Sequence, residues 1–528
     1  MQRIHGFGVW SRREFIGWHR PVMDGPALRP KKASTAASSA STPSTFLFVD
    51  YQDQSSQSHA VAQRKQAFLK RKHHRSRKEE RLRSLKASIG PLPTQTPGPT
   101  RTAANGDTQG APAAGRIVAR AWSLDRPLWS GTPDPFSSLA TTMTADMDLY
   151  FNHYQAHCSR SIWPFGATAL SIWWWQQAWG QPALLHILLS TSAIHRAGRG
   201  LIDRSPSRSD RKAVQDSLHF RTVTIRKLQS LVQDPTAAFL ESTAVTIAHL
   251  ICVEAADANL NAVDWHLNGL AKIINSVGGL DAWNHATISI FYCADFMRGA
   301  LKGCPPAFPM SVIWRGEVLD SLNILDSKRQ SVMSSSIGSH FFDSLWSKKL
   351  HPSLRSIIRL LRVIVYYQQG SQKETPVLND ILLYAGHLIL SAFHECSASD
   401  SQESLRLCLL LYAMVCVWTF QGLACVIFIV DALRHRLKRA LPLLRRVAPQ
   451  LSLWMLFMGG LASTDLTSDA WFVARLAEVA EQLSVGGWDK ALPVLDGFFV
   501  RRPIDRRMMN LWNEVQRQQV LQSPVQSA

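Results

Sequence analysis

The sequence lacks the cysteine spacing of zinc-binding modules. A structural zinc site needs closely spaced thiolates to complete a tetrahedron, and no Cys-x-x-Cys pair occurs among the eight cysteines. Eight cysteines in 528 residues are also too sparse for a disulfide scaffold. We therefore expect reduced, mostly buried thiols in an intracellular protein without a bound metal, at Cys158, Cys252, Cys293, Cys304, Cys396, Cys408, Cys416 and Cys425.

Motifs for catalysis and nucleotide binding are missing as well. The sequence contains no G-x-x-x-x-G-K-[ST] phosphate loop, no G-x-S-x-G nucleophile turn and no H-E-x-x-H metal motif. His186, His195, His249 and His266 lie among apolar residues at helical spacing, so we interpret them as hydrogen-bonded core or boundary residues. We predict neither enzymatic activity nor a cofactor.

Charged residues are scarce and unevenly distributed. They make up 18% of the chain, against roughly 25% in an average soluble protein. Residues 1–120 contain 21 Lys or Arg and 7 Asp or Glu, a net charge of +14, whereas residues 121–528 contain 37 and 32, a net charge of +5. This distribution predicts a basic N-terminal arm on a nearly neutral body, and it suggests a polyanionic partner.

Composition divides the chain into five parts. Residues 1–45 are a Pro/Ala/Ser/Thr-rich leader that we expect to be disordered. Residues 46–88 combine a short apolar start with a basic segment, and residues 89–130 form a Pro/Gly-rich linker. We expect residues 131–520 to form a helical domain and residues 521–528 to be a disordered tail.

The basic segment, residues 61–87, carries 11 Lys or Arg among its 27 residues. If the segment forms a helix, these charges would occupy every face of it and repel one another. Phosphate groups of a partner would neutralise the charges and so stabilise the helix. Nuclear import, non-specific contact with nucleic acid and a solvated charged surface all stay open. No zinc finger, helix-turn-helix or zipper accompanies the segment, so base-specific recognition is not expected. The candidate contact residues are Lys70, Arg71, Lys72, Arg75, Arg77, Lys78, Arg81 and Arg83.

The body of the chain shows helical periodicity. Apolar residues recur at helical spacing, no stretch shows sustained strand alternation, and no fixed repeat period occurs. We therefore predict an all-α, irregular multi-helix domain. The expected helices are 216–232, 241–258, 260–277, 286–301, 353–368, 377–397, 404–421, 423–440, 442–459, 467–483, 488–500 and 508–520.

Residues 407–430 form an uncharged apolar run that is long enough to span a bilayer. Gln421 and Gly422 interrupt it, and this pair suits a turn between two buried helices. A membrane anchor stays open, but we favour the buried helix pair. A second apolar feature is a tryptophan cluster that we interpret as helix-packing core rather than a ligand cage: Trp163, Trp173, Trp174, Trp175 and Trp179.

Several motifs point to a known family. The segment WHLNGLAKIINSVGGL, residues 265–280, contains a His-x-x-Gly-Leu step followed by Gly-Gly. With DPFSSL at 134–139, the helix at 179–197 and the stretches 451–463 and 470–483, it resembles the fungal-specific transcription factor domain proteins, in the variant without the six-cysteine zinc cluster. The family-like residues are His266, Gly269, Leu270, Gly278 and Gly279.

The resemblance implies a nuclear transcription regulator with an all-helical regulatory domain. It also implies a second copy of the chain as a partner and a response to a ligand or to other transcription proteins, whereas non-specific contact with DNA through the basic arm is expected from charge alone. Without the zinc cluster, a protein-interaction scaffold that does not bind DNA is the alternative. We expect structural roles for two family-like residues, with Gly269 allowing close approach of a helix and Gly278 ending one.

Overall fold

The computed structural model describes residues 142–202, 208–325, 335–343, 345–370, 375–420, 422–463 and 466–522. All regular secondary structure in these ranges is helical, which confirms the all-α prediction. The leader, basic segment and linker (1–45, 46–88 and 89–130) lie outside the described residues, as does the tail beyond residue 522.

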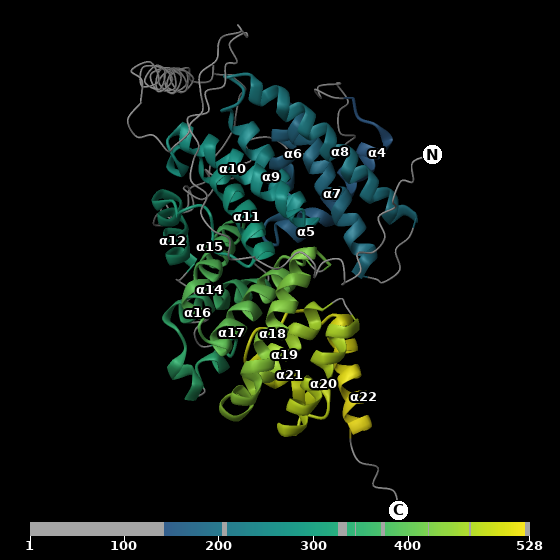
Figure 1. The fold of residues 1–528 in the computed structure, drawn as a ribbon, viewed down its shortest axis with the longest axis vertical. Helices are drawn as coiled ribbons and strands as arrows, with labels where there is room; N and C mark the ends of the chain where they lie inside the picture. The colour runs from purple at the N-terminus through teal and green to yellow at the C-terminus, as the bar shows by residue number, and fades with distance from the viewer. Residues whose placement is uncertain are drawn as a thin grey trace, which may run out of the picture. The chain divides into compact units, whose positions relative to one another are not determined.

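The helices are shown in Figure 1. In the first half of the described chain they are α4 (Ala145–His153), the π-helix η1 (Tyr154–Cys158), α5 (Ser159–Ile162), α6 (Ala167–Trp179), α7 (Pro182–Ile202), α8 (Arg208–Gln233), α9 (Glu241–Ala256), α10 (Leu260–Val277), η2 (Leu280–Ala282), α11 (His285–Lys302) and α12 (Val312–Leu325). The second half comprises η4 (Ser339–Phe341), η5 (Leu345–Lys349), α14 (Pro352–Gln369), α15 (Val377–Ser391), α16 (Phe393–Cys396), α17 (Asp400–Leu411), the π-helix η6 (Tyr412–Val417), α18 (Ala424–Val447), α19 (Pro449–Ala462), α20 (Leu466–Gln482), α21 (Trp488–Asp496) and α22 (Arg506–Gln522).

Helix α10 illustrates how local chemistry sets the helix boundaries. Asn259 caps its N-terminus by accepting a hydrogen bond from the Ala262 amide. At the other end Gly278 adopts a left-handed conformation with φ of 118°, and the Gly279 amide donates to the Ile274 carbonyl at 2.9 Å. The expected helix over 260–277 and its termination at Gly278 are confirmed.

The apolar run 407–430 is divided between two helices. Its first part lies in α17 and η6, and α18 begins at Ala424. Between them the chain turns through Thr419 and Gly422, which have φ values of 55° and 80°. Because α17 and α18 pack against each other, the buried helix pair is the confirmed interpretation. None of the helices in the described ranges has the length and apolar character needed to cross a membrane.

Several predicted helix boundaries are wrong: α8 begins at Arg208 and not at residue 216, α21 ends at Asp496 and not at residue 500, and α18 is a third case. We expected a break at Leu441–Pro442, but α18 continues through Pro442 to Val447, and α19 begins at Pro449. Pro442 lies on the exposed side of α18, where solvent can bond the backbone carbonyl that loses its partner. Burial of Leu437 and Leu444 on the opposite side favours continuation of the helix.

Packing of α18, α19 and α20 positions the groove described below. Helix α19 contacts both α18 and α20, and Figure 1 shows the three helices as neighbours in the green and yellow part of the chain. The ring of Phe472 on α20 lies so close to Gly459 on α19 that a β-carbon there would collide with it. The small residue therefore lets α20 pack tightly on α19, which fixes the distance from α20 to α18.

Candidate functional site

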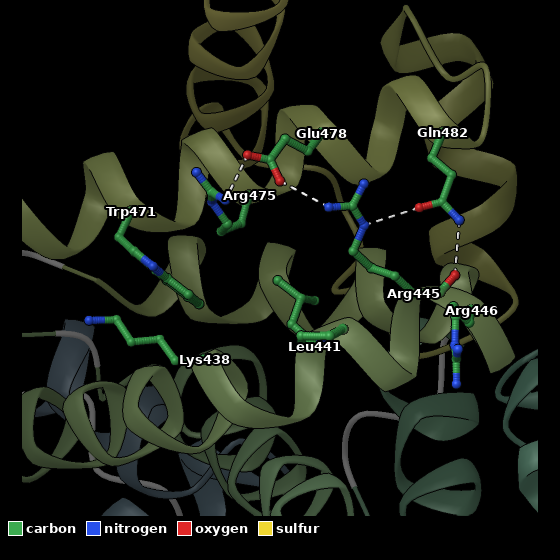
Figure 2. Close-up of a pocket in the computed structure, with 9 residues that line it drawn as sticks. Lys438, Leu441, Arg445, Arg446, Trp471, Arg475, Glu478 and Gln482 are labelled. Carbon is green, nitrogen blue, oxygen red and sulfur yellow. Dashed lines mark hydrogen bonds and ion pairs between the residues drawn. The ribbon is translucent and has the colours of Figure 1, made fainter.

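Helices α18 and α20 line a groove with a volume of about 600 Å³. The lining residues recur at intervals of three to four along each helix, so each helix contributes a single face. Lys438 and Trp471 lie together at one end of the groove, and Arg445 and Gln482 meet at the other (Figure 2). The complete lining comprises Lys438, Leu441, Pro442, Arg445, Arg446, Trp471, Arg475, Glu478 and Gln482.

Glu478 holds two of the groove's arginines in place. Its carboxylate accepts from Nη1 of Arg445 at 3.0 Å and from Nη1 of Arg475 at 2.8 Å (Figure 2). Gln482 bonds Arg445 twice, because its Oε1 accepts from Arg445 Nε at 3.1 Å and its Nε2 donates to the Arg445 carbonyl at 2.9 Å. These contacts join α18 to α20. They also hold the guanidinium groups of Arg445 and Arg475 in the lining of the groove.

Positive charge exceeds negative charge in the groove, where four cationic side chains face one carboxylate. Lys438 lies 6.0 Å from the centre of the Trp471 ring, and neither Lys438 nor Arg446 forms an ion pair with any of the described residues. Elsewhere on α18, by contrast, Arg436 and Arg439 both pair with Asp400, at 2.8 and 2.7 Å. The surplus charge makes the groove suited to an anionic group.

A second polar cluster lies between α11, α12 and α15. His285 Nε2 is 3.1 Å from Asp380, whose other oxygen accepts from Ser289 Oγ at 2.6 Å. The Ser289 hydroxyl donates to the carboxylate and not to the histidine, so the arrangement is not that of a nucleophile with its base. Burial lowers the pKa of His285, but hydrogen bonds and charge from Asp380 and Glu317 outweigh it and raise this pKa to about 8.

The sequence-predicted candidates occupy different places. The basic residues from Lys70 to Arg83 lie outside the described part of the chain. The family-like motif lies on α10 and at its end, and none of its residues lines the groove. His266 is half-buried, and its pKa is lowered by burial and by the charge of Arg221. Leu270 is buried in the core, and Gly279 follows Gly278 in the turn.

The expected role of Gly269 in close helix packing is wrong. Apart from the neighbouring residues and backbone of its own helix, nothing lies within 4 Å of a β-carbon placed at this position. Near the motif lies a buried ion-pair cluster that we did not predict from the sequence. Arg221 on α8 pairs with Glu254 at 3.1 Å and with Asp257 at 2.7 Å, joining α8 to the end of α9.

The histidines and tryptophans are core and boundary residues, but His249 lacks the expected hydrogen bond. His186 Nδ1 lies 2.6 Å from the Pro182 carbonyl, as expected. His249 is buried, and its Nε2 has no hydrogen-bond partner among the described residues. Burial lowers its pKa to about 4, and its ring contacts Trp174 edge-on at 4.9 Å. Trp174 and Trp175 are buried, which confirms their predicted packing role.

No group of three or more His, Cys, Asp or Glu side chains within the described ranges could hold a metal ion.

The groove itself was not predicted, although each of its two faces can be found in the sequence. Lys438, Leu441 and Arg445 are spaced for one helical face, and so are Trp471, Arg475 and Glu478. What the sequence does not reveal is that these two faces oppose each other.

Comparison with known proteins identifies the family. A profile of the fungal specific transcription factor domain matches residues 149–497, about two thirds of the chain. The chain belongs to this family. The matched residues include all of the groove, and membership in the fungal-specific transcription factor domain family supports a role in transcription regulation. No curated protein and no solved structure showed a significant match.

Proposed function

We propose that the protein is a nuclear transcription regulator whose helical domain serves as a regulatory and interaction module. The observation that carries the proposal is the family match over 149–497, which coincides with the helical part of the chain. The basic segment 61–87 supplies nuclear import, non-specific contact with DNA phosphates, or both. Other transcription proteins and a second copy of the chain are the proposed partners, and no catalytic role is proposed.

Sequence-specific DNA recognition is not part of this proposal. The cysteines are not spaced for the zinc cluster through which a helix could be presented to the major groove. Contact through the basic segment would neutralise phosphates without reading bases. Such binding would weaken steeply as salt concentration rises, because it releases condensed counterions.

An interaction scaffold that never contacts DNA is the second candidate, and the absent cysteine spacing favours it. The two candidates differ in one measurable property, the affinity of the purified full chain for duplex DNA. Measurable binding that falls with salt supports the regulator with a DNA-contacting arm. Absence of binding at low salt supports the scaffold.

Nuclear import through the basic segment is tested with a fluorescent fusion of the full chain. Reversal of Arg71, Lys72, Arg75 and Arg77 to Glu should reduce nuclear accumulation and leave the melting temperature unchanged. The control reverses the exposed Arg226 on α8 and Arg359 on α14, and it should remain nuclear. A wild-type fusion that stays outside the nucleus would refute the proposal.

A further inference from the structure

We propose that the groove between α18 and α20 binds an acidic peptide segment of a partner protein, one that also carries an apolar side chain. The inference rests on the proposed role of the helical domain as an interaction module, and it names the chemistry of the partner. It concerns the lining of the groove alone, so it does not depend on contact between the basic segment and DNA.

Charge complementarity gives the first argument. Four cations and one carboxylate line the groove, and that carboxylate, on Glu478, already bonds Arg445 and Arg475. Each of these guanidinium groups has more N–H donors than Glu478 can accept from. Lys438 and Arg446 have no acidic partner among the described residues. An acidic ligand would therefore find cations held in position and only partly neutralised.

Arg475 adds a more specific observation. Its Nε is buried and has no hydrogen-bond acceptor among the described residues, while its Nη1 donates to Glu478. A buried donor without an acceptor is unfavourable. A ligand carboxylate that reached this side of Arg475 would give Nε an acceptor without competing for the nitrogen that bonds Glu478.

The apolar part of the lining favours a peptide over nucleic acid. Leu441 lies between the charged ends of the groove (Figure 2) but is only 5% exposed. The accessible apolar lining is therefore the half-buried Trp471 and the exposed Pro442. A peptide can place an aliphatic or aromatic side chain on these two residues while neighbouring carboxylates reach Lys438 and Arg475. A phosphate backbone has no apolar group to cover Pro442 and Trp471.

The ligand comes from another protein. Residues 1–120 carry a net charge of +14, so the N-terminal part of this chain would be repelled from a groove of the same sign. A groove of about 600 Å³ accommodates a few side chains. This size matches a short linear segment and is too small for a folded domain.

Fluorescence anisotropy of a labelled peptide tests the proposal. The probe is a short peptide of Asp and Glu with one Phe and one Leu, and the protein is the full chain. Arg71, Lys72, Arg75 and Arg77 are first changed to Glu in every sample, because the basic segment would otherwise bind the probe by itself. The key variant in this background is Lys438→Glu with Arg446→Glu. Both side chains are exposed, so the fold should tolerate the change.

The matched control is Arg226→Glu with Arg359→Glu, which changes the net charge equally at exposed positions on α8 and α14. We expect the groove variant to weaken peptide binding at least about tenfold and the control to weaken it less than about twofold. Trp471→Ala should weaken binding several-fold without changing its salt dependence, because it removes apolar contact and no charge.

Three outcomes would overturn the proposal. The first is binding that the groove and control variants reduce equally, which would show attraction by net charge only. The second is absence of binding by the background protein. The third is a duplex DNA probe that binds this protein more tightly than the peptide and loses affinity in the groove variant, which would make the groove a nucleic-acid site. Each result leaves the nuclear localisation measurement unaffected, so failure of the groove and failure of the proposed function are distinguishable.

Discussion

Arg406 and Glu403 form a two-point ion pair inside the protein core. Nε and Nη2 of Arg406 each lie 2.7 Å from an oxygen of Glu403, and the two side chains are 2% and 4% exposed. Nη1 of Arg406 also donates to the Ile389 carbonyl at 3.2 Å. The pair thereby ties α17 to the end of α15 while both charges are removed from water.

Removing one member of this pair should be costly. Glu403→Leu leaves the Arg406 guanidinium buried without a counter-charge, and we expect it to lower the free energy of unfolding by about 3–5 kcal/mol. The double variant Glu403→Leu with Arg406→Met removes both charges and should recover most of this loss. Urea unfolding of the full chain measures both. If the single variant loses less than about 1 kcal/mol, the buried pairing is wrong.

Protonation of His285 should stabilise the fold below neutral pH. Its pKa is raised to about 8 in the folded protein, above the usual value of about 6.5. The resulting stabilisation is fully present below about pH 6.5, and it is lost as pH rises through about 8. It amounts to at most about 2 kcal/mol.

The measurement for His285 compares wild type with His285→Gln by urea unfolding at pH 6 and pH 9. The stability difference between the two proteins should be larger at pH 6 than at pH 9. Because wild type and His285→Gln are compared at the same pH, the titration of every other group that both proteins share cancels. A stability difference that does not change with pH would show that Asp380 and Glu317 do not raise this pKa.

Two glycines of the family-like motif should respond oppositely to the same substitution. Gly269→Ala places a methyl group in open space within α10 and should stabilise the protein by about 0.5–1 kcal/mol. Gly278→Ala forces a non-glycine residue to a φ of 118° and should destabilise by about 1–2 kcal/mol. Each variant serves as the control for the other. Thermal unfolding that shows both to be destabilising would restore a packing role for Gly269.

Local signals made much of the fold predictable. The helix over 260–277 follows from apolar periodicity and from Gly278, both of which act within a few residues. The predicted helix break at Pro442 was wrong. The free-energy cost of a proline inside a helix depends on whether the backbone carbonyl that loses its hydrogen bond faces solvent, and only the packed structure reveals this. The break in the apolar run was predicted because Gly422 is itself a local signal.

The groove could not be predicted for a different reason. Lys438 and Trp471 are separated in sequence by the whole of α19. They come together because α18 and α20 both pack on α19, where Phe472 lies against Gly459. No local pattern encodes this pairing, since it depends on the packing of three helices. The buried Arg221 cluster could not be predicted for the same reason, because Arg221 lies on α8 and its acidic partners lie at the end of α9.

Chromatin occupancy of the tagged full chain tests the central claim most directly, namely that this family member acts on genes in the nucleus. Occupancy is compared between wild type and a variant without residues 61–87. We predict enrichment of wild type at discrete chromosomal sites and a marked reduction without the basic segment. A wild-type profile indistinguishable from that of an untagged strain would contradict the account.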